Sequence, residues 1–507
     1  MLKETRATPG SLVLTHTFDR TFTTLGMKTL IDELWSYVQK GSGSLFDGYH
    51  HVYHHDLNDD LRRFLFATMD EARLWHANSY AKAILKLIDI DDADHFRQGL
   101  LRREVAGNIA YSKQRDHSAH TLHNYIMGWY IYSNSGAIRK TVSRHFKIRG
   151  LKKDRNDIDF RSLWPFVSLL HDIGYLFEGK IDPLATEIQS NQIGIGAEVV
   201  HDYFHHRFWT ECGIDSIYDR NRLRLLAKVE EPDFSNRSIS GVADGLRSLG
   251  DLEKLRGAVR HERDITNAPI GTRDYLSITN GLPGDAFDLW ERHYDYFGLD
   301  SMVQRIRSMR TVFDSLIRDG FGNTGLRVLD HGICSGLLSL LYSTFYFRMY
   351  FGLGLQPPED DHDRSIWIRF REASNIHYPP RSDSEEYTAI WWWTGVVWAT
   401  AATALHNVQQ FGDKWPATCN HPGPLRLDED PLAYLGILVD CLQEWDRYTV
   451  TRESVIGGSL PLQGIDVRLS SKAGKVRIEY GDRMRLESVR RSLDLSLFEW
   501  SKIVEIV

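Results

Sequence analysis

The sequence has few cysteines, no long hydrophobic run and no excess of positive charge. Its four cysteines show no CxxC spacing, which argues against a zinc knuckle or a disulfide framework and favours a reducing, cytoplasmic compartment. The formal net charge of -7 argues against a protein that binds nucleic acid over its whole surface. The first residues lack the basic and then apolar order of a signal peptide, so nothing in the sequence directs export.

Two uncharged runs come nearest to membrane spans. One begins at Gly332 and has 16 residues, and the other begins at Ala389 and has 17 residues. Both are shorter than the roughly 20 apolar residues that a spanning helix needs. Each also lies next to a histidine, His331 before the first run and His406 after the second. We therefore expect two buried helices of a helical bundle and no membrane partner.

Hydrophobic periodicity predicts a mainly α protein with five regions. Of the 507 residues, 42% are hydrophobic, which allows a large core and more than one domain. We expect a helical N-terminal region, an internal insertion in a helical core and a small α+β C-terminal unit, in which KAGK (472–475) is a hairpin turn. The boundaries are 1–110 for the N-terminal region, 111–180 and 325–450 for the two parts of the core, 181–324 for the insertion, and 451–507 for the C-terminal unit.

A histidine and a carboxylate stand together after an apolar helix, in SLLHDIGYLFEG (168–179). Burying such a pair is costly unless something pairs with it, and a metal ion is such a partner. Further histidines and acids attached to apolar helices complete a set of candidate metal ligands: His120, His171, Asp172, His331, His406 and Asp440. Imidazoles and carboxylates without thiolates suit zinc, iron or manganese. Six ligands exceed the needs of one tetrahedral ion, so two ions bridged by one carboxylate are expected, the usual device for hydrolysing phosphate esters.

The order His, His-Asp, His, His, Asp resembles the HD superfamily of metal-dependent phosphohydrolases. The matching segments lie within 111–180 and 325–450, and they are RDHSAHTLHNY, LLHDIGY, LDHGICSGLLSL, ALHNV and LGILVDCLQEWDR. The resemblance implies an HD-type helical bundle in which one ion is held by His120, His171, Asp172 and Asp440. It also implies that Asp172, as a catalytic residue, bridges to a second ion held by His331 and His406. Two divalent ions, Fe or Mn with Mg, Co or Zn as alternatives, would activate a bridging hydroxide.

The first ligand is open to two assignments. His117, His120 and His123 are spaced by three residues, so they lie near one helical face and more than one can approach the site. The residues that follow favour His120 as the ligand. His117 is then a catalytic proton-transfer group or a surface imidazole.

A second His-Asp doublet lies at 201–202, with His205 and His206 after it. Some cyclic-dinucleotide phosphodiesterases of the HD superfamily use an adjacent His pair after the doublet. Here the preceding segment is less apolar and no matching Asp helix follows at short range. We therefore prefer a solvated or partly buried aromatic helix without a metal role.

Substrate phosphate oxygens need cationic partners, and arginine suits them because its fork binds oxygens in pairs. The nearest candidates are Arg115 and Arg447, although each can instead pair with a local acid. Tyr175, three residues after the doublet, is the third candidate for substrate binding. The segment 139–155 carries eight Lys or Arg against one Asp and is interpreted as a basic loop. It is either solvated surface or the place where a phosphate-rich ligand binds.

The sequence favours a metal-dependent phosphohydrolase whose substrate is a nucleotide or a related phosphorylated small molecule. An HD-type di-iron oxygenase is the alternative, because some HD proteins activate oxygen with a similar ligand series. A non-catalytic binding or scaffold protein, whose histidines and acids only brace a helical core, is the second alternative. A homo-oligomer is compatible with the sequence.

Overall fold

The computed structural model describes residues 28–40, 57–67, 70–88, 94, 97, 117–151, 156–176, 283–319, 330–352, 392–407, 421–443, 467–472, 474–481 and 483–507. These residues are mostly helical, which confirms the mainly α prediction. The helices are α1 (Leu30–Gln39), α2 (Leu57–Phe66), α3 (Asp70–Leu87), α5 (His117–Asn134), α6 (Gly136–Ile148), α7 (Asn156–Leu169), α14 (Pro283–Tyr296), α15 (Asp300–Asp319), α16 (His331–Gly352), α19 (Val397–Leu405), α20 (Pro431–Leu442) and α22 (Arg483–Ser496). Shorter helical turns are η2 (Ile173–Leu176), η4 (Trp392–Val396) and η7 (Trp500–Lys502), and the strands are β1 (Lys28–Thr29), β2 (Val467–Lys472), β3 (Lys475–Tyr480) and β4 (Val504–Ile506).

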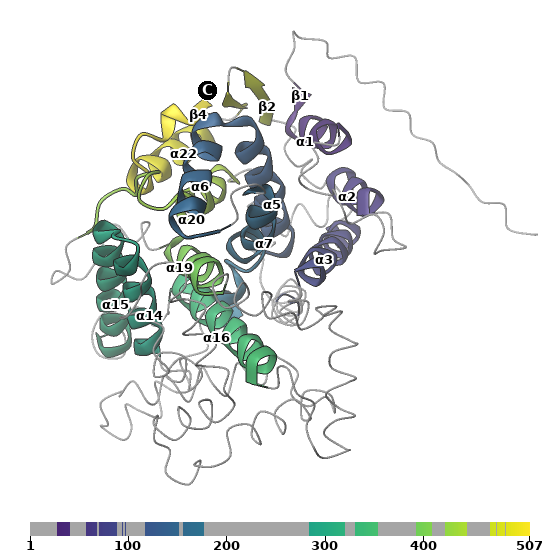
Figure 1. Ribbon diagram of the computed structural model, residues 1–507. Coiled ribbons are helices and arrows are strands. Elements are labelled where there is room, and N and C mark those ends of the chain that lie inside the picture. The colour runs from purple at the N-terminus through teal and green to yellow at the C-terminus, as the bar shows by residue number, and fades with distance from the viewer. Residues whose placement is uncertain are drawn as a thin grey trace, which may run out of the picture.

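The helix α5 lies at the centre of the helical core, beside α7 and α20 (Figure 1). Every residue from Ala119 to Tyr132 is buried, and α5 contains no acid, lysine or arginine. A helix of this kind is stable only where neighbours cover all of its sides. The helices α3, α6, α7 and α20 contact α5 and provide that cover.

The helix α20 is also buried along its whole length. Its start is fixed by Asp430, whose side chain accepts hydrogen bonds from the backbone N–H groups of Leu432 and Ala433. Pro431 occupies the first turn, where a missing N–H costs nothing. The capped start fixes where α20 begins and thereby positions Asp440, which lies more than two helical turns further along.

The described parts of the two uncharged runs form α16 and the segment from η4 to α19, which pack against each other. The residues from Ile333 to Leu340 and from Thr394 to Leu405 are buried. The contact is close, because a Cβ on Gly336 would lie 2.4 Å from the Cβ of Ala404. The expectation of two buried helices is therefore confirmed. Within the described part of the chain, no helix has the length and apolar character needed to cross a bilayer.

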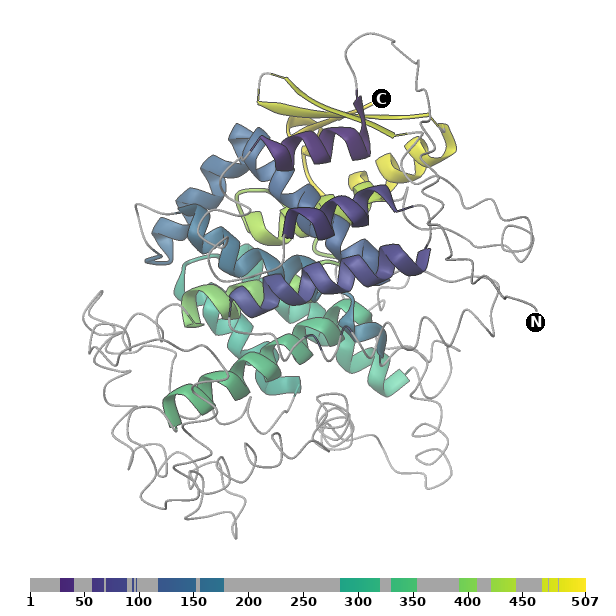
Figure 2. The same cartoon turned by 90° about the vertical axis from the view of Figure 1, so that its right-hand side faces the viewer.

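A four-stranded sheet in the order β1-β2-β3-β4 lies at one end of the helices, next to α1 (Figure 2). β2 and β3 are antiparallel with Lys472 opposite Lys475, which confirms the predicted hairpin. β4 is parallel to β3, whereas β1 adds an antiparallel strand from the N-terminal region. The Tyr480 hydroxyl donates to the carbonyl of Leu442 at 2.6 Å and so ties this sheet to the end of α20.

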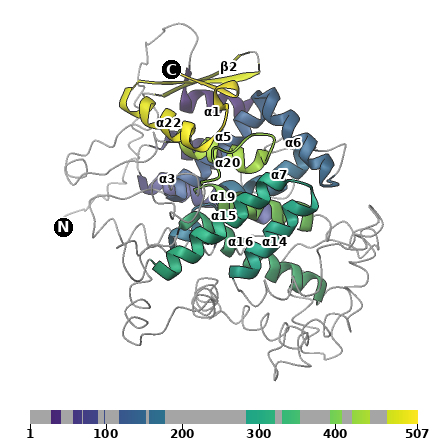
Figure 3. The same cartoon turned by 90° about the vertical axis from the view of Figure 1, so that its left-hand side faces the viewer.

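The helices α14 and α15 lie side by side (Figure 3). Both fall within 181–324, the segment interpreted as an insertion, and the residues of that segment before 283 lie outside the described ones. α14 contacts the core directly, since Trp290 Nε1 donates to Thr400 Oγ1 on α19 at 3.2 Å. The boundaries of the five predicted regions stay predictions.

The interpretation of 139–155 as a basic loop is wrong for residues 139–148, which form most of α6. Four of its side chains are buried at helical spacing: Ile138, Val142, His145 and Phe146. The cations Arg139, Lys140, Arg144 and Lys147 are exposed on the other side of the same helix. The loop interpretation followed the density of charge and missed this amphipathic period. Residues 152–155 lie outside the described residues.

Candidate metal centre

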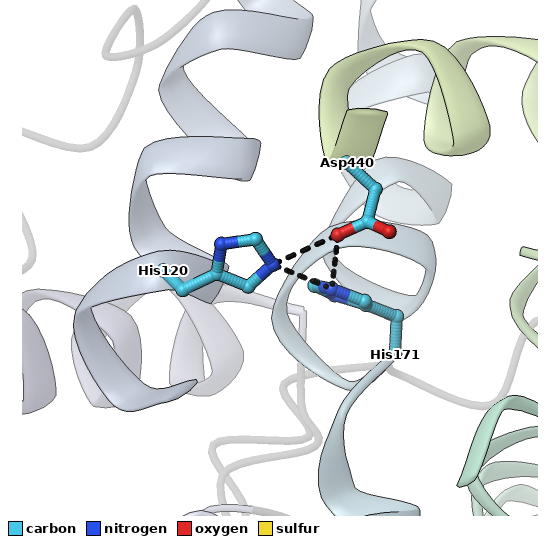
Figure 4. A group of neighbouring side chains, drawn as sticks. All are labelled: His120, His171 and Asp440. Atoms are coloured by element: carbon cyan, nitrogen blue, oxygen red, sulfur yellow. Dashed lines mark hydrogen bonds and ion pairs between the residues drawn. The ribbon is translucent and has the colours of Figure 1, made fainter. Parts of the chain in front are cut away.

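Six predicted ligands from five parts of the chain meet in one buried cluster. His120 lies on α5, His171 and Asp172 form the turn between α7 and η2, His331 begins α16, His406 follows α19 and Asp440 lies on α20. In Figure 4 the side chains of His120, His171 and Asp440 point toward one another. Two groups of three could each hold a metal ion, namely His120 with His171 and Asp440, and His171 with Asp172 and His406.

Helix ends orient two of the imidazoles. Nδ1 of His171 lies 2.8 Å from the carbonyl of Ser168, and Nδ1 of His406 lies 2.7 Å from the carbonyl of Thr403. A carbonyl only accepts, so each Nδ1 carries a proton and donates it. Carbonyls in the last turn of a helix lack partners within that helix, which makes them available. In the neutral imidazole the lone pair then lies on Nε2, which is the atom that faces the cluster.

The first group has donor atoms at coordination spacing. Nε2 of His120 lies 2.9 Å from Oδ1 of Asp440 and 3.3 Å from Nε2 of His171. The distance from Nε2 of His171 to Oδ1 of Asp440 is 3.6 Å. With metal–ligand bonds of about 2.1 Å, adjacent donors lie about 3.0 Å apart in an octahedron and about 3.4 Å apart in a tetrahedron. The observed distances fall around these values, so this donor set fits a metal ion.

The carboxylate of Asp172 lies between two sets of imidazoles. Its Oδ1 is 3.4 Å from His171 Nε2, 3.6 Å from His331 Nε2 and 3.9 Å from His406 Nε2. Its Oδ2 is 3.1 Å from His117 Nδ1 and 3.7 Å from His120 Nε2. The Nε2 atoms of His331 and His406 are 3.2 Å apart. One carboxylate therefore reaches donors on both sides of the cluster.

The charges within the cluster set its protonation. Burial pushes the pKa of Asp172 up, but the neighbouring His171 and His117 outweigh burial and hold that pKa well below its usual range. Burial likewise lowers the pKa of His171, yet Asp172 and Asp440 outweigh it and the pKa ends above its usual value.

Burial and the neighbouring His406 place the pKa of His331 well below its usual value. Burial, then the charge of His171, lowers the pKa of His406 to about 4. His331 and His406 are therefore neutral at pH 7, the form of imidazole that binds metals.

Two hydrogen bonds of Asp330 help to hold the imidazoles of His331 and His406 together. Asn407 Nδ2 donates to Asp330 Oδ2 at 2.6 Å, and Asp330 Oδ1 caps α16 by accepting from the N–H of Ile333. The end of α19 is thereby joined to the start of α16. A Cβ on Gly332 would lie 2.9 Å from the His406 ring, so glycine at this position lets the ring approach.

Within the described part of the chain, His117 and His331 are the most exposed members of the cluster. The side chains of His117 and His331 are 13% and 12% exposed, whereas those of His120, His171, His406 and Asp440 are 2–6% exposed. The Tyr175 ring stacks against His331 at 3.9 Å and lies against the tilted His117 ring at 4.0 Å between ring centroids. Tyr175 therefore contacts both of the more exposed imidazoles.

The remaining predicted residues divide into those placed and those outside the described residues. His117 approaches the cluster through Asp172, as a ligand or a proton-transfer group requires. His123 lies on the same helix but packs against Phe64, away from the metal ligands. Arg115, Arg447 and the rival doublet at 201–202, with His205 and His206, lie outside the described residues.

One residue at the centre was missed by the sequence analysis. Asn124 lies one turn after His120 on α5, and its Nδ2 is 3.2 Å from both His120 Nε2 and His171 Nε2. The spacing of four residues was a usable signal, because side chains at i and i+4 share a helical face. The carbonyls of Ser168 and Thr403 had no such signal, since any residue offers a carbonyl.

Comparisons of the chain with protein-family models, with curated proteins and with solved structures find no match.

Proposed function

We propose that this protein is a metal-dependent phosphohydrolase that uses two divalent ions to hydrolyse a phosphate ester, such as a nucleotide or a related phosphorylated small molecule. The observation that carries the proposal is the position of Asp172. One of its carboxylate oxygens faces His331 and His406, and the other faces a different pair of imidazoles. A carboxylate in this position suits the bridge of a binuclear site, and binuclear sites are the common device for displacement at phosphorus.

The donors of the cluster divide naturally between two ions. In this proposal one ion is held by His120, His171, Asp172 and Asp440, and the other by Asp172, His331 and His406. When bound, two such ions lower the pKa of water and neutralise the charge of the phosphate ester. Four imidazoles with two carboxylates favour Fe or Mn, with Zn or Co as alternatives.

The protein's own groups around the more exposed imidazoles handle protons and access. Asp172 is ionised, so His117 Nδ1–H donates to Asp172 Oδ2 across 3.1 Å. In its neutral form the His117 ring has a lone pair on Nε2, which can take up and return a proton during ester hydrolysis. Tyr175 holds this ring and that of His331 through ring contacts. Among the described residues these side chains border the more exposed part of the cluster, where we expect the substrate to approach.

The test compares the wild type with Asp172→Ala and with Asp288→Ala, a control that breaks a surface ion pair with Arg310 on α14 and α15. Each protein is treated with chelator, reloaded with Mn2+ or, without oxygen, with Fe2+, and assayed for phosphate released from p-nitrophenyl phosphate and nucleotides. We expect metal-dependent release by the wild type and the control, and loss of both release and metal in Asp172→Ala. Circular dichroism checks that all three proteins are folded.

Three results would overturn the proposal. Phosphate release that persists in Asp172→Ala would remove the cluster from the reaction. Iron-loaded protein that consumes oxygen and releases no phosphate would replace hydrolysis by an oxidation. Metal content near zero in the reloaded wild type would leave a buried polar cluster that only braces the helices.

A further inference from the structure

The side chain of Asn124 completes a triangle with two of the imidazoles. The residue is 1% exposed and lies one turn after His120 on α5. Its amide nitrogen is 3.2 Å from His120 Nε2 and 3.2 Å from His171 Nε2, and those two nitrogens are 3.3 Å apart. The three atoms form a nearly equilateral triangle. Its sides lie between the donor spacings of about 3.0 and about 3.4 Å expected for octahedral and tetrahedral shells.

The other end of the same amide lacks a hydrogen-bond partner within the described part of the chain. Oδ1 of Asn124 is buried and accepts no hydrogen bond from the described residues. A buried amide oxygen without a donor is unfavourable, and native structures rarely keep one. The two ends of the amide are nearly equal in shape, so a half-turn about the bond to Cγ exchanges oxygen and nitrogen without moving other atoms. That half-turn brings the unpartnered oxygen to the corner of the triangle.

In the present orientation the amide nitrogen of Asn124 faces Nε2 of both His120 and His171. In the neutral tautomer of His171, with the proton on Nδ1 donated to the carbonyl of Ser168, Nε2 carries a lone pair that can bind an ion. An ion bound by His120 and His171 uses the same lone pairs, and the N–H groups would then point at a cation. Electrostatics therefore reverses the preferred orientation of the amide when a cation occupies the site.

We propose that Asn124 is an oxygen ligand of the ion held by His120, His171 and Asp440, an inference that rests on the metal centre of the proposed function. The ligand is neutral, so it adds a donor atom without adding negative charge. Amide oxygen is a hard ligand of the kind preferred by Mn2+ and Mg2+, and it shifts this site away from the softer ligand sets of zinc.

Two variants separate an oxygen ligand from a hydrogen-bond donor. Asn124→Asp keeps an oxygen beside the two imidazole nitrogens and removes the amide N–H groups. Asn124→Leu keeps the approximate shape of the side chain and removes both the oxygen and the N–H groups. Asn134→Leu is the control, because Asn134 lies at the far end of the same helix and donates to the carbonyl of Tyr130. All variants are made in the full chain and compared by circular dichroism.

The measurement is a titration of chelator-treated protein with Mn2+, followed by calorimetry and by the electron paramagnetic resonance signal of free Mn2+. For Asn124→Leu we expect one of two binding steps to weaken about 10- to 100-fold. Asn124→Asp is expected to bind within about threefold of the wild type or more tightly, and Asn134→Leu to match the wild type.

Three outcomes would overturn the ligand role. Weak binding by both Asn124→Asp and Asn124→Leu would show that the N–H groups matter and that Asn124 only positions the imidazoles. Wild-type affinity in Asn124→Leu would show that the residue is not a ligand, while the proposed function stands. Wild-type protein that binds no Mn2+ would refute the metal centre and the ligand role together.

Discussion

Replacement of His145 by glutamine is expected to flatten the pH dependence of stability. His145 lies on the buried face of α6, where its Nε2–H donates to the carbonyl of Asp428 at 3.0 Å and its ring stacks on Trp398. Burial, then the positive charge of Arg149, lowers the pKa of His145 to about 3 in the folded protein. In the unfolded chain a histidine titrates near 6.5.

The direction in which the free energy of unfolding changes with pH follows from proton uptake. Between pH 6.5 and pH 3 the unfolded chain binds a proton at this position and the folded chain does not, so the free energy of unfolding falls as the pH falls. With pKa values of 6.5 and 3, the contribution lost between pH 7 and pH 5 is about 2 kcal/mol. Glutamine can donate a similar hydrogen bond and cannot titrate, so this loss disappears in His145→Gln.

The assay is urea unfolding at pH 7 and pH 5, followed by tryptophan fluorescence in the presence of chelator. The wild type should lose about 2 kcal/mol more than His145→Gln, because all other histidines titrate in both proteins and cancel in the difference. His145→Phe is the control for the lost hydrogen bond, since it should be less stable at both pH values and show the same weaker pH dependence. Equal losses in the wild type and His145→Gln would refute the reasoning.

Three further predictions concern packing, the more exposed imidazoles of the centre and the ions. Gly128→Ala should lower the free energy of unfolding by about 1–3 kcal/mol, because its Cβ would lie 2.0 Å from the buried Trp164 ring, and an unchanged urea midpoint would contradict this. Tyr175→Ala should weaken binding of one Mn2+ about 10-fold, because His117 and His331 lose the ring that orients them, while Tyr175→Phe should stay near the wild type in the same calorimetric titration. Adding Mn2+ to chelator-treated protein at about 100 times the dissociation constant should stabilise it by about 2.7 kcal/mol, seen as a higher melting temperature, and no shift would argue against a site in the folded state.

The core helices could be predicted because their sequences leave few alternatives. The segments that became α5, α16, α19 and α20 carry long uncharged stretches attached to histidines or an acid, and burial as helices is the simplest way to accommodate them. The hairpin of β2 and β3 followed from alternation around one glycine. The pairing of β1 with β2 could not be predicted, because two residues give no periodic signal. The segment that became α6 was misinterpreted because its charges concealed a helical period.

For the candidate site, the sequence predicted which residues gather but not how each is held. Six ligands lie together as expected, since each is attached to a buried helix and a buried charge needs a partner. Their orientation depends on the carbonyls of Ser168 and Thr403 and on the contact of Asn407 with Asp330, which only the fold brings together. The contact of Tyr175 with two imidazoles is equally a product of the fold.

The separation of the ligands along the chain has a consequence for biosynthesis. His120 and Asp440 are in contact in the folded protein although they are 320 residues apart in the sequence. At 5–20 residues per second, a ribosome needs roughly 16 to 64 s to make that stretch. During this time the nascent chain exposes His120 and His171 without the acid that completes their set. The complete set of donors therefore forms only after α20 has been made and has packed beside α5.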